Sequence, residues 1–329
     1  MNSIGQDSEF HALLRYSAVI GSDPALVQGA GGNVSLKRDG VLWVKASGTW
    51  LARAGTDDIM VPVALDPLLA AIDADDATAM EEAGRFVRGA ENPSGLRPSI
   101  ETTMHALLPH PVVVHVHCVE TIAWSCRADA ESALAPLLAG LGWCFVPYVR
   151  PGAPLTRDIR ARLRPGTDVL VLGNHGLVVG GSTTADAAAL VAEVGHRLRR
   201  VPRVAPSPGD LPQLDGYRPA EDAHTHGTAT DPRALAVARR GSLYPDHVIF
   251  LGRGIAEPPT RDAMMLVVPG RGVLLRQDAS SGAIALARCL ADVTARLDPD
   301  EPLRVLTEAE ESELLGWGAE QYRKSLDRR

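Results

Sequence analysis

The sequence predicts an α/β protein built in two parts, and three observations lead to this class. Short apolar runs rich in β-branched residues, such as 112–117 and 168–172, alternate with longer segments of helical periodicity. The chain has 329 residues, 45% of them hydrophobic and 22% charged, which is typical of a globular protein long enough for two domains. A proline-rich stretch then interrupts the pattern. We therefore expect a larger domain at 1–204, a linker at 205–232 and a small α/β domain at 233–329.

Charge and cysteine content argue against several classes of function. The net charge of −7 and the isoelectric point near 5.8 come with no basic stripe, so we expect no nucleic-acid partner. The sequence has no run of about 18 apolar residues and no basic-then-apolar N-terminal segment, so we expect no membrane association and a cytoplasmic location. The four cysteines form no CxxC pair, which favours reduced thiols.

A glycine-rich loop and a second turn of small residues flank a strand expected at 41–45. The loop, GAGGNVSLK, contains Asn33, and the turn ASGT contains Ser47 and Gly48. Two such turns at the ends of neighbouring strands offer backbone N–H groups and hydroxyls, which are the donors that a phosphate needs. The alternative is that both are only tight turns, because no complete phosphate-loop or dinucleotide motif is present. Lys37 either adds positive charge there or lies in solvent.

The segment PSIETTMHALLPHPVVVHVH carries the strongest signal of chemistry. It begins as a helical turn with Glu101, a metal ligand or a base, and its prolines end the helix before the strand at 112–117. Residues two apart on a strand share a face, so His115 and His117 point to one place and form a chelating pair. The alternative is a pair of satisfied polar residues at a strand end. A third histidine, His175, follows the apolar run VLVL, and three histidines with an open fourth position are typical of a catalytic zinc site.

The same periodicities predict the remaining elements. In the first part we expect strands at 59–63, 143–149, 168–172 and 177–179, and helices at 8–20, 66–90, 118–141, 157–163 and 184–201. In the second part we expect strands at 246–251, 264–268 and 273–276, and helices at 282–297 and 307–326. A second HxH pair, His224 and His226, lies in polar sequence and is expected in a loop. The second part shows no catalytic constellation, so we expect it to support assembly or to shape access to the site, without a catalytic residue.

Five short motifs occur in order along the first part, namely GNVS, ASG, PSxE, HxH and NHG. Over residues 8–201 the chain thereby resembles the class II sugar aldolase/adducin family, which includes fuculose- and rhamnulose-phosphate aldolases, epimerases and a dehydratase. The resemblance implies an α/β/α sandwich around a mainly antiparallel sheet, and a homo-oligomer, usually a cyclic tetramer with active sites between subunits. Residues 241–329 are similar to the segment that follows the aldolase part of bifunctional sugar aldolase/dehydrogenases, although the dehydrogenase itself is absent.

The resemblance also implies roles for the residues at matching positions. Three histidines would bind Zn²⁺ or another divalent metal, namely His115, His117 and His175. Glu101 would be the acid/base catalyst. The substrate phosphate would be held by Asn33, Ser47, Gly48 and Ser99.

The sequence departs from the family pattern at two places. Ile100 stands where several aldolases have a second serine, so either one phosphate contact is missing or the anionic group of the substrate differs. The proton-donating tyrosine of the family has no clear match. Tyr148, in the segment VPY, is a candidate, and the alternative is an ordinary tyrosine at a strand end.

The reaction that the resemblance implies is a retro-aldol cleavage by a metal-dependent lyase. A ketose phosphate would break, through a zinc-stabilised enediolate, into dihydroxyacetone phosphate and an aldehyde. Family epimerases tend to have Asp at the position of Glu101, which favours cleavage here. Epimerisation, dehydration and decarboxylation use the same kind of site and remain alternatives. A non-catalytic, adducin-like interaction module is the alternative of another class, but such modules lack the three histidines.

Overall fold

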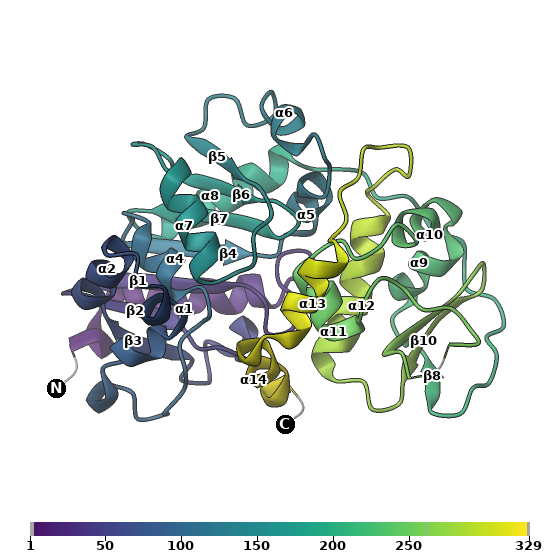
Figure 1. The fold of residues 1–329 in the computed structure, drawn as a ribbon, viewed down its shortest axis with the longest axis horizontal. Helices are drawn as coiled ribbons and strands as arrows, with labels where there is room; N and C mark the ends of the chain where they lie inside the picture. The colour runs from purple at the N-terminus through teal and green to yellow at the C-terminus, as the bar shows by residue number, and fades with distance from the viewer. Residues whose placement is uncertain (1–2, 261, 328–329) are drawn as a thin grey trace.

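A seven-stranded mixed sheet forms the centre of the first part of the chain (Figure 1). The computed structural model describes residues 3–260 and 262–327. Across the sheet the strands follow the order β3-β2-β1-β4-β7-β6-β5. They are β1 (Asn33–Arg38), β2 (Val41–Lys45), β3 (Met60–Ala64), β4 (Val112–Val116), β5 (Trp143–Val146), β6 (Val169–Leu172) and β7 (Gly176–Gly181). Neighbouring strands pair antiparallel, except that β5 and β6 are parallel. The expected mainly antiparallel sheet is confirmed.

Helices cover both faces of this sheet, which confirms the α/β/α sandwich. One face carries α1 (Ser8–Gly21) and α8 (Thr184–Arg197), and the other carries α2 (Leu65–Asp73), α4 (Thr102–Leu107) and α7 (Ala153–Arg162). Alternation along β4 explains the two faces, because Val112 and Val114 pack with the α1 and α8 side while Val113 packs with α4 and α7. His115 has the same parity as Val113. It therefore faces the α4 side, where Glu101 begins that helix.

Shorter helical segments complete the first part. They are η1 (Ser3–Gln6), η2 (Leu51–Arg53), α3 (Ala77–Glu81), η3 (Ala83–Phe86), η4 (Gly89–Glu91), α5 (Val119–Ser125) and α6 (Ala130–Leu134). The long helix expected at 66–90 is thus divided, and Asp75 adopts a positive φ of 51° at the break between α2 and α3. Within the described residues, no helix has both the length and the apolar character needed to cross a membrane.

The second part is a small α/β unit with its own three-stranded antiparallel sheet in the order β8-β10-β9. Its strands are β8 (Tyr217–Pro219), β9 (Met265–Val268) and β10 (Gly272–Arg276). Its helices are η5 (Ala223–His226), α9 (Gly227–Thr230), α10 (Pro232–Ala238), α11 (Pro245–Leu251), α12 (Ser281–Thr294), α13 (Glu308–Gly316) and α14 (Gly318–Asp327). The additional C-terminal α/β region is therefore confirmed.

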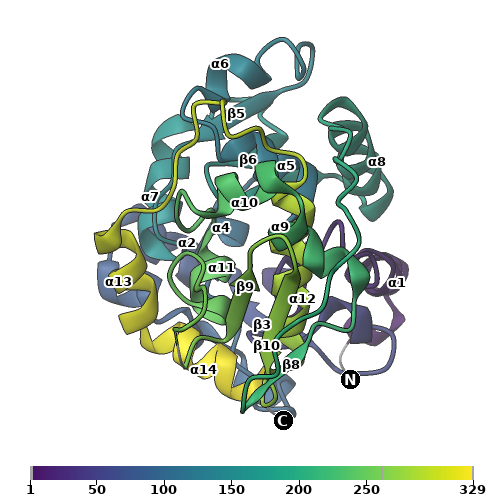
Figure 2. The ribbon, with the colours of Figure 1, turned by 90° about the vertical axis from the view of Figure 1, so that its right-hand side faces the viewer.

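The two parts share packing. Val119 and Ile122 of α5, a helix of the first part, belong to the same apolar cluster as Leu286 and Leu290 of α12. In Figure 1 the yellow helices α13 and α14 lie between the two parts, and Figure 2 shows them on the side of α7, away from α1 and α8. The second part is thus in contact with the first through its interior and through its last two helices.

Three local predictions for the second part are wrong. The strand expected at 246–251 is the helix α11. Every residue of this helix is buried, so its apolar run shows neither helical nor strand periodicity. Pro245 stands in the first turn, where proline favours a helix. The helix expected at 307–326 is broken at Trp317 into α13 and α14. The second HxH pair is not in a loop but in η5, where the His226 ring bonds the carbonyl of Ala220 and the backbone N–H of Val273.

Candidate active site

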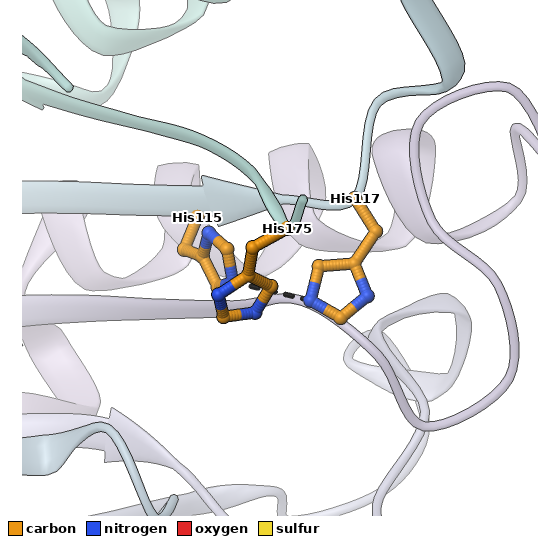
Figure 3. Close-up of side chains that lie close together, drawn as sticks. All are labelled: His115, His117 and His175. Atoms are coloured by element: carbon orange, nitrogen blue, oxygen red, sulfur yellow. Dashed lines mark hydrogen bonds between the residues drawn. The ribbon is translucent and has the colours of Figure 1, made fainter. Parts of the chain in front are cut away.

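Three histidines meet at one end of the sheet (Figure 3). His115 lies near the end of β4, His117 follows that strand, and His175 stands in the tight turn between β6 and β7. The turn is set by Asn174, which adopts a positive φ of 51° and donates its side-chain amide to the carbonyls of Leu243 and Arg304. One ligand atom from each histidine lies within 4.8 Å of the others. The convergence expected from the sequence is present.

Hydrogen bonds at Nδ1 show which ring nitrogen of His115 and His117 faces the space between the three histidines. The Nδ1–H of His115 donates to the carbonyl of Leu177 at 3.0 Å, and that of His117 donates to Asp246 Oδ2 at 3.1 Å. Each Nε2 atom therefore keeps its lone pair, and the two Nε2 atoms lie 3.1 Å apart. Burial lowers the pKa of His175 to about 3 and also lowers that of His115. Both imidazoles are neutral at neutral pH, as metal ligands must be.

Glu101 stands beside the three rings. Its Oε2 lies 3.4 Å from His115 Nε2, and its Oε1 lies 3.7 Å from His175 Nε2. Burial alone raises the pKa of this carboxyl, but the two imidazoles, charged at the low pH where it titrates, and a hydrogen bond from Asn33 outweigh burial and lower the pKa to about 2. The Oε1 atom is buried and makes no hydrogen bond with any described residue. Three imidazole lone pairs are a donor set that fits a divalent cation, and the Oε1 oxygen of Glu101 beside them is available as a base.

A buried chain of hydrogen bonds fixes the orientation of Glu101. Asn33, on β1, faces His115 across the strand pair and donates to Glu101 Oε2 at 2.8 Å. The amide oxygen of Asn33 accepts from His105 Nε2, and His105 Nδ1 accepts from the Ser35 hydroxyl at 2.7 Å. Burial lowers the pKa of His105 to about 3, so this ring is neutral and holds one tautomer. His105 was assigned no role from the sequence.

The residues expected to bind phosphate line the same pocket. Asn33, Ser47, Gly48 and Ser99 all border it, next to Glu101 and two of the histidines. Asn33 and Ser99 are engaged with Glu101, since Ser99 Oγ accepts from the Glu101 N–H and from the Asn33 amide, both at 3.2 Å. Ser47 and Gly48 form the turn after β2, and Gly48 has a φ of 76°, a conformation that glycine adopts without strain. The structure brings these residues together, and their role toward phosphate remains a prediction.

Two other predicted residues lie elsewhere. Lys37 neither borders the pocket nor lies free in solvent, because its ammonium donates to the carbonyl of Leu108. Tyr148 borders a different cavity, together with Asn174 and Arg304, and the Arg304 guanidinium lies 4.9 Å from its ring centroid. Its buried hydroxyl makes no hydrogen bond with a described residue. Within this chain Tyr148 is therefore not positioned as a proton donor for the pocket.

Four charged residues of the pocket were missed by sequence reasoning, namely Lys45, Asp246, Glu320 and Arg323. Lys45, the last residue of β2, is buried and donates to the carbonyl of Ala30 at 3.0 Å. Burial, reinforced by Arg323, lowers its pKa to about 7. A lysine that ends an apolar strand directly before the ASG turn was a usable signal. The other three come from the second part, which was expected from the sequence to support assembly or to shape access to the site.

The three residues from the second part form a charge network over the histidines. Arg323 of α14 contacts both carboxylate oxygens of Asp246 at 2.8 Å and those of Glu320 at 3.2 and 3.3 Å. Burial alone raises the pKa of Asp246, but Arg323 and His117 outweigh it and lower that pKa. Burial raises the pKa of Glu320. The pocket left beneath this network has a volume of about 30 Å³, roughly the space of one water molecule.

Comparison with known proteins supports the reading of the first part. The family model described as class II aldolase and adducin N-terminal domain matches residues 13–200. An uncharacterized oxidoreductase of Bacillus subtilis, YuxG, is 32% identical over 186 residues, which are 52% of this chain but only 26% of YuxG. An L-fuculose phosphate aldolase of Methanococcus vannielii is 28% identical over 174 residues, 50% of this chain and 80% of that protein. The solved N-terminal class II aldolase domain of a Thermoplasma acidophilum protein has a TM-score of 0.51 and 29% identity, and the match covers 58% of this chain and 92% of that structure.

The matched region contains Glu101 and the three histidines described above. Class II aldolases use a divalent metal, and the donor set of three histidines suits one. The match covers more than half of the 329 residues, and the sandwich fold is that of the Thermoplasma domain. The chain therefore belongs to the class II aldolase and adducin family, and its matched domain is of the aldolase enzyme type.

Proposed function

We propose that this protein is a metal-dependent lyase that cleaves a ketose 1-phosphate into dihydroxyacetone phosphate and an aldehyde. The observation that carries the proposal is the meeting of three imidazole nitrogens beside a buried Glu101 oxygen that accepts no hydrogen bond from a described residue. We take the metal to be zinc, because imidazole sites with one position left for substrate are typical of catalytic zinc. When bound, the metal supplies a Lewis acid for the substrate oxygen that gains negative charge as the carbon–carbon bond breaks.

Glu101 is the acid/base in this proposal. Its pKa of about 2 keeps it anionic at neutral pH, so it can accept a proton. Asn33 occupies its Oε2, and Oε1 is left to face the pocket. We assign to Oε1 the proton at the carbon that becomes the nucleophile. Asn33 and His105 act behind it by keeping the carboxylate in one orientation.

An anionic substrate group fits the other end of the pocket. Ser47 and Gly48 offer the turn after β2, and Ser99 accepts two hydrogen bonds while its hydroxyl hydrogen remains to donate. Two cations border the same space, Lys45 and Arg323. Charge-assisted donors bind phosphate more strongly than neutral ones, which compensates for the serine missing at Ile100. The pocket volume of about 30 Å³ is small for a ketose phosphate, and the proposal therefore includes a movement of α14, which brings Arg323, when substrate enters.

The test is a panel of ketose 1-phosphates with metal-loaded protein. Dihydroxyacetone phosphate release is coupled to glycerol-phosphate dehydrogenase and read as NADH consumption. Glu101→Gln should retain the metal and lose at least about 100-fold in kcat, the usual contribution of general acid–base catalysis. Glu131→Gln, an exposed carboxylate on α6, is the matched control and should leave kcat unchanged.

Other outcomes of this assay would move or end the proposal. Products lighter by water or by carbon dioxide, without NADH consumption, would identify a dehydratase or decarboxylase that uses the same residues. Isomeric products of unchanged mass would identify an epimerase. Protein that contains no metal after purification without chelators, with His115→Ala indistinguishable from wild type, would favour a non-catalytic interaction module.

The remaining expectations belong to the same proposal. The homotetramer rests on family resemblance, and light scattering of the purified chain measures it. The divisions at 1–204, 205–232 and 233–329 stay proposals, although β8, η5 and α9 already lie inside the segment expected to be a linker. A sugar phosphate as the small-molecule partner and a cytoplasmic location stay predictions as well.

A further inference from the structure

Of the three metal-site histidines, His117 alone is held by a side chain from the second part. His115 bonds the carbonyl of Leu177, which lies on the neighbouring strand β7. His117 instead bonds the carboxylate of Asp246, 129 positions further along the chain, in the first turn of α11. The 3.1 Å contact joins Nδ1, the nitrogen that points away from the histidine cluster.

Asp246 is held firmly in this position. Asp246 is 3% exposed, and the Arg323 guanidinium lies 2.8 Å from each of its carboxylate oxygens. The Arg323 guanidinium in turn lies 5.2 Å from the ring centroid of Phe250, one turn further along α11. The carboxylate is therefore fixed from one side by α14 and from the other by His117.

The loop before β1 is shaped to admit this pair. A Cβ built on Gly31 would stand 2.8 Å from His117 Nδ1 and 3.2 Å from Asp246 Oδ2, so a side chain there would collide with both groups. The amide of Gln28 donates to the backbone carbonyl of His117 at 3.2 Å and holds its main chain. Both the ring and its backbone are thus fixed by neighbours, and Gly31 leaves the room for the carboxylate.

We propose that Asp246 is a positioning residue for the metal ligand His117, so that the second part of the chain completes the metal centre of the first. The carboxylate accepts the Nδ1 hydrogen, keeps the ring in one tautomer and aims the Nε2 lone pair at the position between the three histidines. This inference rests on the metal binding in the proposed function. It extends that function, since nothing in the matched region 13–200 supplies this carboxylate.

The first test measures metal affinity in the full-length chain by competition with a chelator. Asp246→Ala should bind Zn²⁺ about 10- to 100-fold more weakly, the usual effect of removing a carboxylate behind a metal-ligating histidine. The matched control is Asp231→Asn, which removes another well-buried carboxylate of the second part. Asp231 pairs with Arg203 at 2.7 Å and contacts none of the three site histidines. Its Zn²⁺ affinity should stay within twofold of wild type.

A second readout separates positioning from a merely structural effect. In metal-free protein, nitrogen-15 shifts of the His117 ring should report the Nδ1-protonated tautomer in wild type and a mixture of tautomers in Asp246→Ala. The visible spectrum of the Co²⁺-substituted protein should also change in this variant and not in Asp231→Asn. If Asp246→Ala does not fold because buried Arg323 loses one of its two carboxylate partners, Asp246→Ala/Arg323→Gln removes both charges and is measured in its place.

The outcomes distinguish this inference from the function on which it rests. Wild type that binds no metal would end the proposed function, while the tautomer measurement would still test the contact of Asp246 with His117. Wild type that binds Zn²⁺, together with a folded Asp246 variant of equal affinity, equal Co²⁺ spectrum and equal tautomer, would overturn the inference and leave the function standing.

Discussion

At the scale of single residues, the pocket contains a lysine that titrates near neutral pH. Lys45 is almost fully buried, and burial lowers its pKa from 10.5 to about 7. In the unfolded chain the same ammonium keeps its proton up to its ordinary pKa. Between about pH 7 and 10.5 the unfolded state therefore binds more protons than the folded state, and the free energy of unfolding rises with pH over this window.

The expected rise of the free energy of unfolding with pH can be tested with two matched variants. Relative to Lys45→Met, wild type should gain stability from pH 7 upward, by about 1 kcal/mol per pH unit in urea unfolding. Lys37, whose pKa burial lowers to about 8, provides the comparison, and the difference between wild type and Lys37→Met should begin to rise near pH 8. A Lys45→Met difference that is flat from pH 6 to 9 would contradict the burial argument.

The residues that sequence reasoning found and missed differ in how local their causes are. His115 and His117 were found because the two-residue period of a strand puts them on one face, a relation that needs no tertiary information. His175 and Glu101 were found through short motifs. Asp246 and Arg323 were missed because their position depends on how α11 and α14 pack against the first part, and no local pattern in either helix records that packing.

At the scale of elements, α14 closes the pocket. Leu326 lies against the turn after β2, so that a Cβ on Gly48 would come within 2.6 Å of Leu326 Cδ1. The Arg97 guanidinium lies 4.4 Å from the ring centroid of Tyr322 on the same helix. With Glu320 and Arg323 bordering the pocket, the helix makes contact along its length and covers the pocket, and in the proposed function it lifts when substrate enters.

Loosening this cover should change access more than affinity. Leu326→Glu places a charge against the turn at Gly48, and we expect a chelator to extract the metal about 10-fold faster at similar equilibrium affinity. Hydrogen exchange of 318–327 should rise in parallel. Leu315→Glu on α13, where the leucine is 38% exposed, is the control. Equal extraction rates in both variants would show that α14 does not limit access.

The error in element type at 246–251 has a clear physical origin. The run at 246–251 was read as a strand because a short apolar segment buried on all sides has no amphipathic period. The strand β4, at the centre of the large sheet, and the strand β6, next to its edge, were predicted correctly because both are short apolar runs that contain valines, which favour strands. Interior helices of a shared core are thus the elements that composition identifies least well.

At the scale of the whole molecule, the metal site and the shared core both connect the two parts. The three histidines belong to the first part, Asp246 belongs to the second, and α5 packs in the cluster around α12. A metal that binds only the folded site stabilises the protein by about 4 kcal/mol at 1,000 times its dissociation constant. Because residues of both parts form the site, metal binding should stabilise both parts against unfolding.

Calorimetry tests this coupling. Zn²⁺-loaded protein should unfold in one transition, and removal of the metal should lower the Tm of the whole transition by several degrees. The same removal from Asp246→Ala should lower the Tm less, since that variant holds the metal more weakly. If chelation shifts one of two separate transitions and leaves the other in place, the two parts unfold independently and the coupling is absent.

Trp317, which lies between α13 and α14, can report the movement of α14 by its fluorescence. Trp317 separates α13 from α14, and the guanidinium of Arg150 lies 4.2 Å from its ring centroid. The ring also packs against Gly152, where a Cβ would stand 3.3 Å away. When α14 lifts, the indole loses both neighbours and meets water, so its fluorescence emission should move to longer wavelength. The chain thus carries, at a natural tryptophan, a dye-free way to time each opening of the pocket in stopped flow, with Trp317→Phe as the blank.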